Sequence, residues 1–186
     1  MYLKHHLPNL TMTFATTEWT GAVNMLLVGD SLAIIQRSQE VPSHKGQLAL
    51  LGGHRNKNEL SPLETAQREF EEETGLDASE VAYHSYLPSV KTGRGNTIVP
   101  VLGRYQKSKE HFLEMAKSNG EWDDLLLVDV NYLSNIDNWQ KAKTNYRTGN
   151  LYFVPILPDV YDSQKNSENH ILWGATAKII WYFFKF

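Results

Sequence analysis

Cysteine is missing from the 186 residues of this chain. Its absence excludes disulfide bonds, thiolate metal sites and a cysteine nucleophile, and it agrees with the reducing cytoplasm, which is where we expect the protein. Long apolar runs are missing as well, because no window reaches the ~18 residues of a membrane span and the N-terminal residues include no apolar stretch of signal-peptide length. We therefore expect neither a targeting segment nor a membrane partner.

Positive charge is not in excess either. Lysine and arginine total 18 against 21 aspartate and glutamate, and no basic stripe alternates with aromatic residues. A nucleic-acid partner is therefore not expected, and a polyanionic substrate must be held by a few local groups. The seven histidines include no pair at the H-E-x-x-H spacing, which argues against a zinc site. With 41% hydrophobic residues the chain can bury a full core, and we expect one domain over residues 1–186.

The chain is rich in acid at one place, where four carboxylates occupy the five positions 69–73. On a helix, Glu69, Glu72 and Glu73 lie at i, i+3 and i+4 and share one face. Like charges at this spacing repel by ~0.2–0.5 kcal/mol per pair. A hard divalent ion reverses the sign of that interaction, and Mg²⁺ or Mn²⁺ prefers carboxylate oxygens and bridges to substrate phosphates. Glu71 points away from the other three and is expected to be solvated.

The ends of this helix are marked by local signals. Ser61 followed by Pro62 and Glu64 forms a capping box with proline at the first helical position, and Gly75 is suited to the left-handed residue after the last turn. The sequence therefore predicts a helix over residues 62–74. The carboxylates lie at its C-terminal end, where the macrodipole is negative and favours cations. Because several acidic residues break this preference together, the pattern indicates a function more than a role in folding.

An apolar segment, Gln47 to Leu51, and the glycine pair Gly52-Gly53 precede the helix. Alone, the acidic run is as typical of a solvated helix face as of a metal site. A strand, a glycine turn, a loop and an acidic helix together form a cradle in which backbone carbonyls can join the carboxylates around a cation.

These features resemble the Nudix box. The positions that carry the likeness are Gly53, Glu59, Arg68, Glu69, Phe70, Glu72, Glu73, Gly75 and Leu76. Eight residues separate Glu59 from Arg68, so that the box is one residue longer than usual. The resemblance implies an α+β fold of the Nudix type, an α/β/α sandwich with a mixed β-sheet between helices. It also implies that Glu69, Glu72 and Glu73 bind divalent ions, that the Gly52 carbonyl helps, and that Arg68 orients the glutamates.

A second resemblance concerns the substrate. The positions of Arg37-Ser38, Gly46 and Gly52-Gly53 reproduce the spacing of a signature of the coenzyme A pyrophosphatase branch. By this likeness Arg37, His44 and Lys45 are candidates to contact the 3′-phosphate or the diphosphate of coenzyme A. Pro42, however, stands where the signature has a second arginine, and proline cannot bind phosphate in the bidentate way of a guanidinium.

Two further cations, Lys91 and Arg94, lie in a glycine-bearing segment, residues 91–96. This segment can close on a substrate phosphate, or it can be a plain hairpin tip.

Hydrolysis of a diphosphate needs charge neutralisation, a water held in line and a base. The candidates for the base are Glu69 and Glu121. In the family that the box resembles, a loop glutamate downstream of it ligates metal or acts as base, and Glu121 matches that place. Asp123 and Asp124 are neighbours that can substitute for it. The acidic residues 121–124 are equally typical of a solvated turn.

Hydrophobic periodicity predicts the remaining elements. The aromatic segment 179–186 indicates a final helix, from about residue 169, that packs on the core or across a homodimer interface. Gly29-Asp30 marks a hairpin. The predicted strands are 22–28, 32–37, 47–51, 81–87, 97–105, 125–130 and 152–156, and the second predicted helix is 109–118.

The sequence therefore predicts a Mg²⁺- or Mn²⁺-dependent hydrolase of a diphosphate linkage in a small nucleotide-type substrate. Coenzyme A or a derivative, cleaved to 3′,5′-ADP and 4′-phosphopantetheine, is the leading substrate. The first alternative is a Nudix pyrophosphatase of ADP-ribose, nucleotide sugars or other nucleoside diphosphate derivatives. The second is a non-catalytic nucleotide-sensing module, although such a module does not need a full set of metal-binding glutamates.

Overall fold

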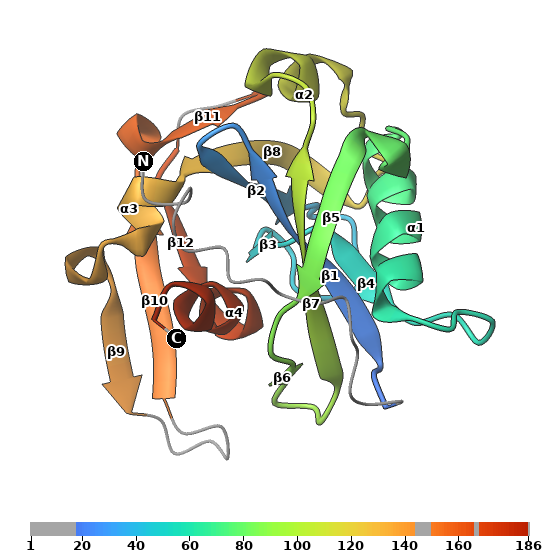
Figure 1. Ribbon diagram of the computed structural model, residues 1–186. Helices are drawn as coiled ribbons and strands as arrows, with labels where there is room; N and C mark the ends of the chain where they lie inside the picture. Colours follow the sequence, from blue (N-terminus) through green and yellow to red (C-terminus); the bar gives the residue numbers. More distant parts are fainter. Residues whose placement is uncertain (1–17, 144–149, 166–167, 186) are drawn as a thin grey trace.

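A computed structural model describes residues 18–143, 150–165 and 168–185. In this part of the chain a mixed β-sheet separates two sets of helices (Figure 1), which confirms the predicted α+β class. The main strand order is β11-β8-β2-β1-β7-β5, with β1 and β7 parallel and the other neighbouring pairs antiparallel. Its strands are β1 (Gly21–Val28), β2 (Ser31–Arg37), β3 (Leu48–Ala49), β4 (Gly52–His54), β5 (Val81–Tyr86), β6 (Val90–Lys91), β7 (Thr97–Tyr105), β8 (Trp122–Asp129) and β11 (Tyr161–Ser163).

A second, three-stranded sheet has the order β12-β10-β9. It consists of β9 (Gln140–Lys143), β10 (Asn150–Ile156) and β12 (His170–Trp173). The helices are α1 (Pro62–Thr74), α2 (Lys109–Met115), α3 (Val130–Ser134) and α4 (Gly174–Lys185), with short 3-10 turns η2 (Ala78–Glu80), η3 (Ile136–Asn138) and η4 (Pro158–Val160). No helix among the described residues combines the length and the apolar character needed to cross a bilayer.

Each face of the main sheet has its own core. Phe70 of α1 and Phe112 of α2 pack with β-strand residues in one buried cluster. Leu133 of α3, Ile180 of α4 and Val154 of β10 belong to the other. In Figure 1, α1 and α4 accordingly lie on opposite sides of the sheet. The buried rings of Phe70 and Phe112 therefore fix α1, and with it the acidic residues, against the sheet.

The strand predicted over 47–51 is wrong in its extent, because only β3 within it pairs with β2 and the chain then moves on to pair with β1 from Gly52. β3 pairs with β2, with Ala49 opposite Ile35, whereas β4 pairs with β1, with Gly52 opposite Val23. The chain thus enters the gap where β1 and β2 separate. Gly52 has a φ of 145°, and a side chain there would collide with the backbone of β1, so only glycine fits.

The C-terminal prediction also needs correction. Residues 170–173 form β12, paired with β10 so that Leu172 lies opposite Val154, and the helix begins only at Gly174, whose φ is 72°. The expected packing of the helix on the core is confirmed, since Trp181 stacks on Tyr152 with ring centroids 4.5 Å apart. The second predicted helix is shorter than expected and ends at Met115. Helix 62–74, strand 97–105 and the hairpin at Gly29 agree with the predictions, whereas the N-terminal residues 1–17 lie outside the described part.

Candidate active site

Helix α1 carries the acidic run, and its caps are those that the sequence predicts. The Ser61 hydroxyl accepts a hydrogen bond from the Glu64 amide at 3.3 Å, and the Glu64 carboxylate accepts one from the Leu60 amide at 2.9 Å. At the other end Gly75, with φ of 70°, donates its amide hydrogen to the Glu71 carbonyl. Because Phe70 is fully buried on the sheet side, the rotation of the helix is fixed and Glu69 and Glu73 face the glycine pair of β4.

Glu73 is the most deeply buried of the acidic residues in this run, with 1% of its surface exposed. Its Oε2 accepts a hydrogen bond from the Gly52 amide at 2.7 Å, whereas its Oε1 is buried with no hydrogen-bond partner among the described residues. Burial foremost, and repulsion from Glu69 and Glu121, raise the pKa of Glu73 to about 8 against the opposing effects of the Gly52 amide and Arg37. The site therefore contains a buried carboxylate oxygen that lacks a positive partner.

Glu69 lies over the second glycine of the pair. A side chain at Gly53 would meet the Glu69 carboxylate and displace it, so the glycine leaves room for Glu69 at this place. Burial raises the pKa of Glu69, Arg68 lowers it, and the negative charges of Glu72 and Glu121 raise it again. The net shift is upward, which reports a crowded acidic environment.

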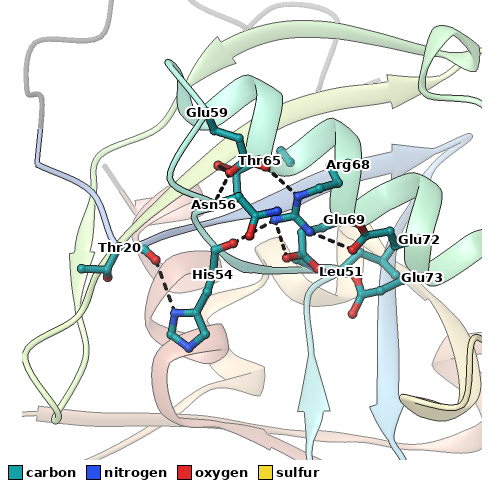
Figure 2. Close-up of polar contacts among 12 residues, drawn as sticks. Thr20, Leu51, His54, Asn56, Glu59, Thr65, Arg68, Glu69, Glu72 and Glu73 are labelled. Carbon is teal, nitrogen blue, oxygen red and sulfur yellow. Dashed lines mark hydrogen bonds and ion pairs between the residues drawn. The ribbon is translucent and has the colours of Figure 1, made fainter.

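Arg68 connects most of the acidic side chains (Figure 2). Its guanidinium is 2.6 Å from Glu59 Oε1, 2.8 Å from Glu69 Oε1 and 2.8 Å from Glu72 Oε2. It also donates to the His54 carbonyl at 2.8 Å. Glu72 is the outermost of the three carboxylates, with its side chain 53% exposed. Arg68 thus holds Glu69 and Glu72 in place and leaves Glu73 without an ion pair among the described residues.

Glu59 is fully occupied by structural contacts despite the extra residue in the preceding loop. Its carboxylate accepts hydrogen bonds from the Thr65 hydroxyl at 2.6 Å, the Asn56 amide at 2.8 Å and Arg68. Burial raises its pKa, but these three bonds together bring it below the ordinary value. The longer loop therefore still delivers Glu59 to Arg68, where it anchors the guanidinium.

Glu71 departs from the prediction that it is only solvated. It is exposed, yet its Oε1 accepts a hydrogen bond from the Ala78 amide at 3.0 Å and so supports the turn η2. It takes no part in the contacts around Arg68 that the structure describes.

Glu121 comes close to this group from the turn before β8. Its negative charge raises the pKa of both Glu69 and Glu73. Its neighbours serve the backbone instead, because Asp123 accepts from the Gln39 amide at 3.1 Å and the buried Asp124 accepts from the Leu125 amide at 2.8 Å. Of the three acidic residues predicted for this turn, Glu121 is the one placed to act with the helix carboxylates.

The predicted substrate-binding cations are divided in space. Arg37 ends β2 and is close enough to lower the pKa of Glu73, and its Nε is buried without a hydrogen-bond partner among the described residues. His44 adopts a left-handed φ of 58° and contacts Gln47 at 3.0 Å, in the exposed loop that also carries Lys45.

Lys91 and Arg94 are exposed on the β6–β7 hairpin, at the end of the sheet where α1 begins, whereas the glutamates lie at the end of that helix (Figure 1). The structure thus brings only Arg37 of these cations to the acidic group.

Two residues at the site were missed by the sequence interpretation. Asn24 is buried in an otherwise apolar strand. It donates to the Leu51 and Ala66 carbonyls at 3.3 and 2.9 Å, and so it joins β1 to the segment before β4 and to α1. Its polar side chain in that strand was a usable signal. Trp122 donates its indole hydrogen to the Glu73 carbonyl at 2.7 Å. No sequence pattern predicts that contact, because it joins residues 49 positions apart.

Three hollows of the described surface lie away from the acidic run. Two shallow hollows, of about 560 and 580 Å³, run along α2 and β11 and are lined by none of the predicted site residues. A smaller one, of about 110 Å³, lies beside Asp124 and His170. None of these three hollows is lined by the carboxylates of α1.

The donor set around Glu73 fits a hard divalent cation. The unpartnered buried oxygen of Glu73, the carboxylates of Glu69 and Glu121, and the tight glycine backbone supply oxygen ligands and an excess of negative charge. Among the described residues no group of three or more acidic, histidine or cysteine side chains already converges at metal-binding distance. The ion pairs of Arg68 explain this, because they hold Glu69 and Glu72 toward the guanidinium.

Comparison with known proteins agrees with these observations. The NUDIX domain family matches residues 19–141. A protein described as Uncharacterized Nudix hydrolase NudL, from Pectobacterium atrosepticum, is 34% identical over 81% of this chain and 71% of its own length. Nudix hydrolase 22, chloroplastic, from Arabidopsis thaliana is 27% identical over 82% of this chain and 48% of its own length, so the chain spans about half of that relative.

Among solved structures, the Nudix hydrolase RenU from M. smegmatis has 20% identity and a TM-score of 0.49, covering 61% of this chain and 72% of that one. The family match over more than half of the chain and the likeness to NudL show that the chain belongs to the Nudix hydrolase family.

Proposed function

We propose that this chain hydrolyses a diphosphate linkage in a small nucleotide-type substrate, with Mg²⁺ or Mn²⁺, and that residues 1–186 form one domain for this task. The observation that carries the proposal is the buried, unpartnered Oε1 of Glu73 beside Glu69 and Glu121. A buried carboxylate without a partner is costly, and it persists in proteins where a ligand compensates it.

Glu69, Glu72, Glu73 and Glu121, with the Gly52 carbonyl, are the proposed metal-binding groups. When bound, the cation neutralises the charge of the diphosphate and orients the reacting water. Arg68 keeps Glu69 and Glu72 in place between turnovers, and its bond to Glu59 fixes the guanidinium itself. No covalent nucleophile is needed, since the oxygen of water attacks phosphorus while the bond from phosphorus to the bridging oxygen breaks.

The proton of that water goes to a carboxylate, and we assign this role to Glu121. Glu121 is exposed, and its carboxylate accepts a long hydrogen bond, 3.4 Å, from the Asn119 side-chain amide. Glu69, the other candidate, is paired with Arg68 at 2.8 Å, so that its Oε1 is already engaged by the guanidinium. Glu69 is accordingly assigned to the cation.

Coenzyme A or a derivative is the proposed substrate. Support comes from the spacing of Arg37-Ser38, Gly46 and Gly52-Gly53, and from the position of Arg37 next to Glu73 with an unpartnered Nε. One specific observation favours ADP-ribose or another nucleoside diphosphate derivative instead, namely Pro42 in the place of a second arginine.

A substrate panel separates these proposals. Purified protein with Mg²⁺ or Mn²⁺ is incubated with coenzyme A, ADP-ribose, nucleotide sugars and dinucleoside polyphosphates, and the products are identified by mass. We expect the highest kcat/KM for coenzyme A, with 3′,5′-ADP and 4′-phosphopantetheine as products. Equal or faster cleavage of ADP-ribose contradicts the proposed substrate, and metal-dependent binding without turnover in the whole panel indicates a sensing module.

Two arginine variants sharpen the panel. Arg37→Met is expected to raise KM for coenzyme A about tenfold, the effect of losing one charged hydrogen bond. Arg94→Met is the matched control, because Arg94 lies on the β6–β7 hairpin and is expected to leave KM within about twofold. The reverse order of the two effects contradicts the assignment of Arg37.

A further inference from the structure

The turn before β8 caps the C-terminal end of α1. The last carbonyls of an α-helix have no partner within the helix and need one from elsewhere. Here the Trp122 indole donates to the Glu73 carbonyl at 2.7 Å, and the Lys117 amide donates to the Thr74 carbonyl at 2.8 Å. Trp122 is 3% exposed, so its hydrogen bond is shielded from water. Glu73 thus offers its carboxylate to the site and its carbonyl to the turn.

The turn itself is fixed on both sides of Glu121. The Ser118 hydroxyl donates to the Trp122 carbonyl at 2.6 Å and accepts from the Gly120 amide at 3.1 Å. The Glu121 amide donates to Asn119 Oδ1 at 3.0 Å, and its carbonyl accepts from the Ser38 amide at 2.9 Å. The backbone of Glu121 is therefore held firmly while its carboxylate remains exposed. This is expected of a carboxylate that must be well positioned and free to act at the site.

We infer that Trp122 is a positioning residue. It holds Glu121 beside Glu69 and Glu73 through its hydrogen bond to the Glu73 carbonyl, in the last turn of α1. The role of Glu121 in this inference rests on the proposed function. The bond links the two elements that supply the acidic side chains. Backbone bonds support it, since the Lys117 amide donates to the Thr74 carbonyl of α1 and the Ser38 amide, just after β2, donates to the Glu121 carbonyl. Loss of the indole hydrogen frees the turn to move away from the helix end while the aromatic packing is kept.

Two matched phenylalanine variants test the inference. Trp122→Phe removes the indole hydrogen and retains a ring in the core. Trp139→Phe removes an equivalent one, since Trp139 is 8% exposed and donates to the Leu133 carbonyl at 2.7 Å, in the cluster on the other face of the sheet. In a titration with Mn²⁺ alone, we expect about fivefold weaker binding for Trp122→Phe, because one hydrogen bond at the site is lost. We expect a change below about twofold for Trp139→Phe, because its hydrogen bond lies away from the site. Equal effects of the two variants overturn the inference.

A double variant asks whether Trp122 acts through Glu121. In the Glu121→Gln background, Trp122→Phe is expected to add no further loss of Mn²⁺ affinity, because the group that it positions no longer carries charge. A full additional loss shows that Trp122 acts by another route and overturns the inference.

Amide hydrogen exchange in the metal-free protein keeps this inference distinct from the proposed function. Exchange at residues 118–121 is expected to become faster in Trp122→Phe and to stay unchanged in Trp139→Phe. Unchanged exchange in Trp122→Phe overturns the positioning role whether or not the protein binds metal. Faster exchange supports that role even where the panel shows no turnover, which contradicts only the proposed function.

Discussion

Replacement of Glu73 by glutamine is expected to lower kcat for diphosphate hydrolysis about 10²-fold or more, as does the loss of other groups that stabilise charge at an active site. The fold is expected to be at least as stable as that of the native protein. Glutamine keeps an oxygen that accepts from the Gly52 amide and is always neutral, whereas Glu73, with its pKa raised to about 8, carries a buried charge in only a fraction of the molecules at neutral pH. Steady-state kinetics and urea unfolding at neutral pH measure the two effects.

A control for this prediction lies two residues earlier on the same helix. Glu71→Gln also replaces a glutamate of the acidic run, but the Glu71 side chain is exposed and supports η2. We expect its kcat to stay within about twofold of the native value, as for a surface change away from the chemistry. If Glu73→Gln keeps a third or more of the native kcat, or unfolds the protein, Glu73 is a structural residue and the metal assignment is wrong.

Replacement of Arg68 by methionine is expected to impair both stability and catalysis. Glu59 loses its positive partner, and Glu69 and Glu72 are left to repel each other. We expect a loss of about 2 kcal/mol in the free energy of unfolding, between the values for exposed and buried ion pairs because the Arg68 side chain is partly exposed. Misplacement of Glu69 is expected to reduce kcat about tenfold or more.

Lys107→Met is the matched control for Arg68. Lys107 makes one surface ion pair, 2.8 Å to Glu80, and in the described structure it pairs with none of the carboxylates that Arg68 holds. Its removal is expected to cost less than about 1 kcal/mol of stability and to leave kcat unchanged. Equal losses of stability in the two variants would show that Arg68 is an ordinary surface residue rather than the connection among three carboxylates.

The contrast between Glu71 and Glu73 shows which features of the site could be predicted from the sequence and which could not. The caps at Ser61 and Gly75 are local, so both ends of α1 were predictable, and helical spacing set Glu71 apart from its neighbours. Spacing could not tell that Glu73 is buried and Glu72 half-exposed, because this depends on how β4 and the turn of Glu121 pack against the helix.

Elements that depend on distant partners were less predictable. The segment 47–51 looks like one apolar strand, yet only residues 48–49 pair with β2, and the chain passes to β1 from Gly52 because those two strands separate. Residues 170–173 form a strand only because β10 offers an edge, although their composition suits the helix that follows. The sequence does not single out Trp122, and only the fold reveals its bond to Glu73.

The most direct test of the central claim is the rate of hydrolysis before and after removal of divalent cations, with the substrate of the panel that is cleaved fastest. The protein is treated with a chelator, and the products are followed by phosphorus NMR before and after Mg²⁺ or Mn²⁺ is added back. We predict no detectable cleavage of the diphosphate in chelator, full recovery on addition of either cation to the native protein, and no recovery in Glu73→Gln. Undiminished hydrolysis in chelator would contradict the account.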